Sequence, residues 1–227
     1  MSSLTMLRNV PLFAELSDQE IGALADSLAQ RTFAKGMIIF HKGSVGQNLY
    51  IVESGKVRIF LLSESGQEIS VNLYGPGQVF GELTLLDGLP RSAGAVAMER
   101  TVTLILHRDD FLRHLEAYPR MARSIMAVLS TRLRYTTSYA ESLAFLDVYG
   151  RVAAKLLELA DRYGVPQGED VVIDLRMTQA ELASWVVATR EFVNKVLGAY
   201  RDQGLIRVEG QRITILDEQR LKKRVVY

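Results

Sequence analysis

The chain has 227 residues, of which 48% are hydrophobic and 23% charged, with a net charge of +1 at pH 7 and no cysteine. This length favours two compact domains. No apolar run approaches the roughly 18 residues that a membrane span needs. The lack of cysteine excludes thiolate-ligated iron–sulfur clusters and cysteine-based zinc sites.

The charge is balanced along the chain: residues 1–149 carry 14 Lys and Arg against 15 Asp and Glu, and residues 150–227 carry 13 against 11. Any contact with DNA must therefore come from a local arrangement of side chains, not from a basic tail. The first residues lack the pattern of an export signal, so we expect a cytoplasmic protein without a membrane partner.

Short helices are expected over residues 1–30, where Ser17 and Glu20 have capping-box spacing. From about Arg31 the chain changes to β-branched and aromatic segments separated by glycine-containing turns, at residues 37–40, 48–52, 56–62, 68–74 and 101–107. Short strands with regular glycine turns are typical of an antiparallel barrel or jelly roll. A β domain is predicted at about residues 31–107.

A long helix is predicted from Arg120 to about Phe145, a stretch without glycine or proline. One set of its residues recurs at alternating spacings of three and four, which is the pattern of a helix-pairing seam: Met126, Leu129, Leu133, Thr136, Ala140 and Leu143. We expect these residues to form a dimer interface with a second copy of the helix. The alternative is a helix that lies on its own barrel.

Residues 146–150 are an expected hinge, and the pattern beyond them predicts a winged helix-turn-helix. Three helices are expected at 151–163, 178–186 and 189–201, followed by a two-stranded hairpin around Glu209-Gly210. The predicted fold class is therefore α+β: a β-roll over residues 1–118, a dimerisation helix over 119–146 and a winged helix-turn-helix over 147–227.

The stretch from Phe80 to Ala93 combines the features of a nucleotide-binding site. Gly81 directly precedes a short helical turn and lets backbone amides point at an anion, and Arg91 can close on the same anion with charge-assisted hydrogen bonds. Glu82 would repel a phosphate, so its presence is explained if it accepts a hydrogen bond, for instance from a ribose hydroxyl. The combination describes a nucleotide better than a bare phosphate.

This stretch resembles the phosphate-binding cassette of cyclic-nucleotide-binding domains, especially in the cyclic-AMP receptor/fumarate-nitrate regulator family. The resemblance implies that Glu82 holds the ribose 2′-hydroxyl and that Arg91 and Ser92 bind the cyclic phosphate. It further implies a nucleotide site completed by Gly81, Leu83, Ala93, Ile59 and Val71, with the last two lining the base pocket. The alternative is a degenerate cassette that keeps the turn and binds nothing.

The same resemblance gives roles to polar residues of the long helix. Thr136 and Thr137 of the two subunits are expected to meet the adenine, and Arg132, one helical turn earlier, is expected near the phosphate. A polar residue in a helix-pairing seam is costly without a partner. The alternative for Thr136 is that it only sets the register of the seam.

In the C-terminal domain, Thr178 is expected to cap one helix, with Glu181 at its third position. The second helix presents side chains that can bond base edges in the major groove. The expected DNA-contacting residues are Thr178, Gln179, Thr189, Arg190, Glu191, Asn194 and Lys195. The alternative is a solvated amphipathic helix in an ordinary helical domain.

Thr189-Arg190-Glu191 followed by Lys195 resembles the recognition helix of the cyclic-AMP receptor, which implies double-stranded DNA with palindromic GTGA-like half-sites. Two departures leave the outer base positions open: Lys195 stands where that receptor has arginine, and Phe192 replaces a small hydroxyl residue. Val187 occupies the turn position where glycine is common, so a strained or differently shaped turn is expected.

The resemblance covers roughly residues 8–216 and implies a homodimeric transcription regulator controlled by a cyclic nucleotide, with cAMP as the expected effector and RNA polymerase as a further partner. We expect no enzyme activity, metal, haem or iron–sulfur cluster, because His41, His107 and His114 lie apart in the sequence. The alternatives are a regulator with another effector, and a cyclic-nucleotide-binding module that does not act on DNA.

Overall fold

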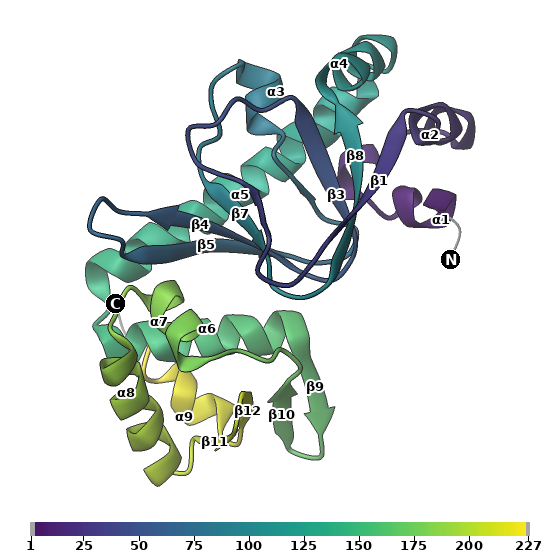
Figure 1. The fold of residues 1–227 in the computed structure, drawn as a ribbon. Coiled ribbons are helices and arrows are strands. Elements are labelled where there is room, and N and C mark those ends of the chain that lie inside the picture. The colour runs from purple at the N-terminus through teal and green to yellow at the C-terminus, as the bar shows by residue number, and fades with distance from the viewer. Residues whose placement is uncertain (1–2, 226–227) are drawn as a thin grey trace. The chain divides into compact units, whose positions relative to one another are not determined.

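The computed structural model describes residues 3–225, and the chain separates into two compact units, Met1–Leu133 and Arg134–Tyr227. The boundary lies inside a single helix, α5 (Arg120–Phe145). A β-sheet unit, a long helix and a helix-turn-helix unit follow one another along the chain (Figure 1), which confirms the predicted fold class. No helix among the described residues is long and apolar enough to cross a membrane.

Two four-stranded antiparallel sheets build the N-terminal unit, in the orders β1-β8-β3-β6 and β2-β7-β4-β5. Five of the strands match the predicted segments: β2 (Ile38–Phe40), β3 (Asn48–Ser54), β4 (Val57–Leu62), β5 (Glu68–Tyr74) and β8 (Thr101–His107). The sequence reading missed β1 (Leu28–Phe33), β6 (Val79–Phe80) and β7 (Gly94–Ala97).

Residues 28–30 were predicted to be helical, and this is wrong. They form the start of β1, whose pairing with β8 runs from Leu28 opposite Leu106 to Phe33 opposite Thr101. The helical segments that precede it are α1 (Ser3–Arg8), η1 (Pro11–Phe13) and α2 (Asp18–Ala25). Ser17 and Glu20 form the predicted capping box at the start of α2.

The helices after the barrel pack on it by one face only. α4 (Arg108–Ala117) and the first turns of α5 bury Phe111, Met121 and Ile125 in the same apolar core as the N-terminal helices. Most of the predicted seam faces away from this core: Met126 is 59% exposed and Leu133 68% exposed. Leu129 is the exception, because it packs partly against the barrel core.

Three helices and a hairpin form most of the C-terminal unit, as predicted, with small shifts in their bounds. The helices are α6 (Val148–Tyr163), α7 (Gln179–Val186) and α8 (Arg190–Asp202), and the hairpin strands are β11 (Ile206–Glu209) and β12 (Arg212–Ile215). A second hairpin, missed in the sequence, extends the sheet to the order β11-β12-β10-β9 with β9 (Gly164–Gln167) and β10 (Asp170–Ile173). A short helix, α9 (Glu218–Lys222), follows.

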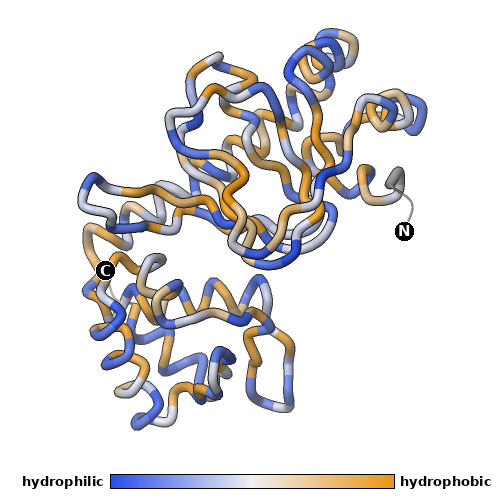
Figure 2. Tube along the Cα trace, in the orientation of Figure 1, coloured by the Kyte–Doolittle hydropathy of each residue, from blue (hydrophilic) through white to orange (hydrophobic). Residues whose placement is uncertain are grey.

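The expected hinge is shorter than predicted, since α6 already begins at Val148 and Asp147 caps it. The amphipathic character of α8 is visible as alternating hydrophilic and hydrophobic stretches along its trace (Figure 2). Its apolar face is buried and carries Val193, Val196, Leu197 and Tyr200. The opposite face of α8 is therefore available for solvent or a partner.

Candidate functional site

Arg91 is the central cation of a pocket in the N-terminal unit. Its guanidinium is buried and donates from Nη1 to the carbonyl oxygen of Gly81 and from Nη2 to that of Asn48, both at 2.6 Å. The group also lies 4.3 Å from the ring centroid of Phe40. Burial lowers the pKa of Arg91, although the group stays charged at neutral pH because its ordinary pKa is far above 7.

Two glycines make room for this arginine. A Cβ atom at Gly81 would lie 2.6 Å from Nη1 of Arg91, and one at Gly46 would collide with the same guanidinium. Gly81 also has a φ of +82°, a conformation that other residues rarely adopt. Gly81 was predicted from the motif, whereas Gly46 lies 45 residues before Arg91 and has no local signal.

Glu82 is almost fully buried and forms an ion pair with Arg132, with Oε1 and Nη1 2.5 Å apart. Arg132 also donates to the carbonyl oxygen of Val79, and its guanidinium lies 4.9 Å from the ring centroid of Tyr74. Arg132 was expected near the phosphate, and here it pairs instead with Glu82, the carboxylate that was predicted to hold the ribose. Because Arg132 belongs to α5, this ion pair connects the cassette to the long helix.

Two buried polar atoms of this pocket have no hydrogen-bond partner among the described residues: Oε2 of Glu82 and Nε of Arg91. Buried polar atoms in folded proteins are nearly always hydrogen-bonded, and each exception calls for an explanation. Oε2 is a hydrogen-bond acceptor that belongs to the Glu82 carboxylate, and Nε is a hydrogen-bond donor that belongs to the Arg91 guanidinium. A ligand that offers both a donor and an anionic acceptor fits this pair.

A cavity of about 80 Å³ lies between these groups. We call it the ligand pocket, and it is lined by Phe40, Ile59, Tyr74, Phe80, Gly81, Glu82, Leu83, Thr84, Arg91, Ser92, Ala93 and Arg132. Its volume is well below the roughly 300 Å³ at which small-molecule pockets usually begin. A nucleotide therefore needs more room than this conformation offers, and Arg132 is a lining side chain whose movement would provide it.

The structure brings most of the predicted nucleotide-site residues together, with three exceptions. Val71 is not among the lining residues. It lies three positions from the lining residue Tyr74, so alternation along β5 turns it to the other face, and the register with β4 skips it, from Ile59 opposite Asn72 to Phe60 opposite Ser70. Thr136 and Thr137 lie on α5 beyond the boundary, in the second unit, and their contact with adenine stays a prediction.

Three aromatic side chains that were not predicted form a wall of the pocket, those of Phe40, Tyr74 and Phe80, and Tyr50 packs against this wall. The rings of Tyr50 and Phe80 stack with centroids 5.0 Å apart, and Tyr74 stacks on Phe80 at 6.1 Å. Phe40 lies 5.9 Å from Phe80. Their inward positions on short strands were the signal that could have identified them. Such a wall offers an apolar surface for a flat ring.

The second candidate site is the surface of α7 and α8. Thr178 caps α7 and forms a capping box with Glu181, as predicted, and the Thr189 hydroxyl accepts a hydrogen bond from the backbone N–H of Phe192 at 3.2 Å. The Gln179 side-chain amide donates to Oδ1 of Asn194 at 3.1 Å and so connects the two helices. The side chains predicted to read bases are all exposed: Arg190, Glu191, Asn194 and Lys195.

The turn between these helices keeps the left-handed conformation even though it lacks glycine. Val187 has φ and ψ of 50° and 58° and is the only non-glycine residue with positive φ among those described. A β-branched side chain is a steric outlier there. Of the two expected outcomes, a strained or a differently shaped turn, the left-handed conformation of Val187 supports the strained one.

Comparisons with known proteins identify a domain in each of the two units. Residues 30–118 match the family model of the cyclic nucleotide-binding domain, and residues 150–224 match that of the Crp-like helix-turn-helix domain. The CRP-like cAMP-activated global transcriptional regulator of Mycobacterium tuberculosis is 35% identical over 219 residues, which cover 96% of this chain and 98% of that protein.

Two further relatives come from Thermus thermophilus. Its cyclic AMP receptor protein is 37% identical over 217 residues, which cover 93% of this chain and 97% of that protein. The crystal structure of a CRP/FNR-family transcriptional regulator is 30% identical, has a TM-score of 0.72, and covers 87% of this chain and 98% of that one. Because the likeness spans both units in order, the chain belongs to the CRP/FNR family of DNA-binding transcription regulators.

Proposed function

We propose that the chain acts as a homodimer that binds a specific DNA palindrome, and that cAMP in the ligand pocket controls its affinity for DNA. The observation that carries the effector is a pair of buried atoms that have no hydrogen-bond partner within residues 3–225, Oε2 of Glu82 and Nε of Arg91. A ribose 2′-hydroxyl can donate to the carboxylate, and a cyclic phosphate can accept from the guanidinium. One nucleotide thus satisfies both atoms.

Control of DNA binding is best explained as a population shift. The ligand pocket is smaller than a nucleotide in the described conformation, so the ligand favours a conformation in which Arg132 has moved and Arg91 keeps its place. Because Arg132 is a residue of α5, its departure from Glu82 alters the contacts of the long helix. The nucleotide shifts the equilibrium only as far as it binds one state better than the other.

The homodimer is supported by the exposed seam of α5. Met126, Leu133, Thr136, Ala140 and Leu143 are all exposed in the single chain, with exposures of 59% and 68% for the first two. Large apolar side chains repeated along one stripe of a helix are typical of a pairing surface. Two copies related by a twofold axis carry two recognition helices, which suit a palindrome with half-sites about one DNA turn apart.

Specific reading of DNA is assigned to the first turns of α8. Arg190 and Lys195 can donate to guanine, and Glu191 can accept from the amino group of cytosine in a GTGA-like half-site. Glu191→Ala is expected to relax discrimination at one base pair of each half-site by about 1–3 kcal/mol and to leave the others unchanged. Binding to a series of single-base-pair variants of the palindrome measures this, and a uniform loss across the series contradicts base readout.

The effector is tested by calorimetry with cAMP and 2′-deoxy-cAMP. Wild-type protein is expected to bind cAMP near one per subunit and to bind the deoxy analogue about tenfold or more weakly, because a hydrogen bond to a charged group is lost. Glu82→Ala is expected to bind the two ligands equally. If the wild-type protein does not distinguish them, Glu82 does not hold the ribose.

A regulator of the same fold with another effector is the second candidate function. Titration with cGMP separates the two, since binding of cGMP in preference to cAMP, or of neither, overturns cAMP as the effector while leaving DNA binding intact. Contact with RNA polymerase follows from the family resemblance. It is tested by transcription in vitro from a promoter that carries the palindrome, with and without the protein.

A further inference from the structure

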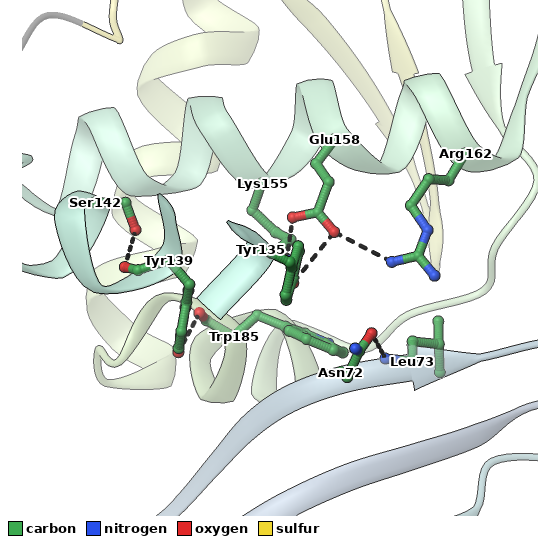
Figure 3. Close-up of polar contacts among 9 residues, drawn as sticks. All are labelled: Asn72, Leu73, Tyr135, Tyr139, Ser142, Lys155, Glu158, Arg162 and Trp185. Atoms are coloured by element: carbon green, nitrogen blue, oxygen red, sulfur yellow. Dashed lines mark hydrogen bonds and ion pairs between the residues drawn. The ribbon is translucent and has the colours of Figure 1, made fainter. Parts of the chain in front are cut away.

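The last turn of α7 is held by side chains from two other helices. The final carbonyl groups of a helix have no partner within the helix itself. Here the Tyr139 hydroxyl of α5 donates to the carbonyl oxygen of Trp185 at 3.1 Å, and Nε of Arg151 of α6 donates to that of Val186 at 2.8 Å. All these residues belong to the C-terminal unit, and Figure 3 shows the Tyr139 contact.

The Trp185 side chain is fixed as well as its carbonyl group. Nζ of Lys155 lies 4.4 Å from the centroid of the Trp185 ring. Lys155 is itself buried, forms an ion pair with Glu158 and donates to the Tyr135 hydroxyl at 3.1 Å (Figure 3). Trp185 is therefore held at its carbonyl by α5 and at its ring by α6.

The segment held in this way lies directly before the recognition helix. Val186 ends α7, Val187 takes the strained left-handed conformation, and Thr189 already caps α8. Only Val187 and Ala188 separate the fixed turn from that cap. Since so short a connection leaves little freedom, the position of the Trp185 carbonyl group sets where the first turn of α8 begins.

α5 carries both this contact and the dimer seam. Thr136 and Ala140 belong to the exposed seam, whereas Tyr135 and Tyr139 occupy neighbouring positions on an adjacent stripe of the same helix and contact α6 and α7. Because a helix moves as a rigid body over one or two turns, a rotation or shift of the seam displaces the Tyr139 hydroxyl with it.

We propose that Tyr139 is a positioning residue for the recognition helix, through which a movement of α5 reaches the turn at Val187. The proposal rests on the function proposed above, in which the effector acts on α5. Tyr139 contacts neither the nucleotide nor the DNA in this account. It acts by holding the Trp185 carbonyl group in the place that sets the start of α8.

The chain offers a matched control for Tyr139. The Tyr200 hydroxyl also donates to a backbone carbonyl, that of Tyr149 in the first turn of α6, at 2.8 Å in the same unit. Burial raises the pKa of both hydroxyls to about 12, so both are protonated donors at neutral pH. Tyr139→Phe and Tyr200→Phe therefore each remove a comparable hydrogen bond to a backbone carbonyl group, and only the first removes a contact that holds the last turn of α7.

The experiment measures binding of a fluorescent GTGA palindrome to the full-length dimer, with and without saturating cAMP. The ratio of the two dissociation constants is the coupling factor. We expect Tyr139→Phe to lower this factor about tenfold and Tyr200→Phe to leave it within about twofold. Thermal unfolding is expected to shift equally in both variants, so lost stability alone does not account for the difference.

The outcomes separate this proposal from the function on which it rests. If the wild-type coupling factor is large and both variants retain it, or both lower it equally, the positioning role is overturned while cAMP control stands. If the wild-type protein binds the palindrome equally well with and without cAMP, control by cAMP is overturned, and the role of Tyr139 in transmitting it is overturned too.

Discussion

Two buried charged clusters in this chain look alike and differ in one property. The ligand pocket contains Glu82, Arg91 and Arg132, and what we call the Lys155 cluster contains Tyr135, Lys155, Glu158, Arg162 and Trp185. The second lies beside the larger hollow, about 220 Å³ against about 80 Å³. Only the first contains buried side-chain atoms without a partner among the described residues.

On this difference in the state of the polar groups we base the proposal that the ligand binds in the smaller pocket and not beside the larger hollow. In the Lys155 cluster, Glu158 forms ion pairs with Lys155 and Arg162 and accepts a hydrogen bond from the Tyr135 hydroxyl. The charge of Glu158 is therefore compensated from within the protein. In the ligand pocket, one oxygen of the Glu82 carboxylate and one nitrogen of Arg91 have no hydrogen-bond partner among the described residues. We therefore assign recognition to the first cluster and positioning to the second.

The largest expected effect tests this assignment of roles directly. Arg91→Ala is expected to weaken cAMP binding at least about 100-fold, because the charge-assisted contacts to the phosphate are lost from a buried site. Arg162→Ala, which removes an arginine from the Lys155 cluster, is expected to change cAMP affinity by less than about twofold. Calorimetry measures both.

Circular dichroism and the elution volume of the dimer check that each variant folds and dimerises. Arg91→Lys is a second variant that keeps the charge but loses the forked geometry, and a loss of about tenfold is expected for it. Unchanged affinity in Arg91→Ala, or an equal loss in Arg162→Ala, contradicts the assignment.

The next effect concerns the stability of the Lys155 cluster. Glu158→Gln leaves the Lys155 ammonium buried without a counter-ion and is expected to lower the free energy of unfolding by about 3 kcal/mol. Lys155→Met is expected to cost about 1 kcal/mol or less, because Glu158 keeps Arg162 and is 28% exposed. Urea unfolding of the two variants measures the asymmetry. Equal costs would show that the cluster is not held together by compensation of the Lys155 charge.

The smallest effect concerns the turn that this cluster supports. Val187→Gly relieves a left-handed conformation that is unfavourable for a β-branched residue, and it is expected to raise the free energy of unfolding by about 1 kcal/mol. Thermal unfolding measures the shift. A lower stability would mean that packing of the Val187 side chain outweighs the backbone strain, and that the turn is not strained as described.

Much of the fold could be predicted because its signals are local. The capping boxes at Ser17 and Thr178 need only four residues each, and both are present. The cassette around Gly81 and Glu82 is also a continuous stretch. The missed strands are short or poor in branched residues: β6 has two residues, and β7 reads Gly-Ala-Val-Ala.

The rest of the site depends on contacts between distant residues. Arg132 pairs with Glu82 across 50 positions, and Tyr139 reaches Trp185 across 46, with no pattern in either segment that points to the other. Val71 was misplaced for a different reason. It was assigned from the family resemblance alone, and alternation along β5 places it on the opposite face from Tyr74, which lines the pocket.

Regulation by cAMP requires that binding in the ligand pocket changes the affinity for DNA. We would measure binding of the GTGA palindrome to wild-type protein and to Arg91→Ala over a range of cAMP concentrations. The account predicts that cAMP strengthens DNA binding by the wild-type protein and has no effect on Arg91→Ala. Wild-type binding that does not respond to cAMP, or an equal response in Arg91→Ala, would contradict it.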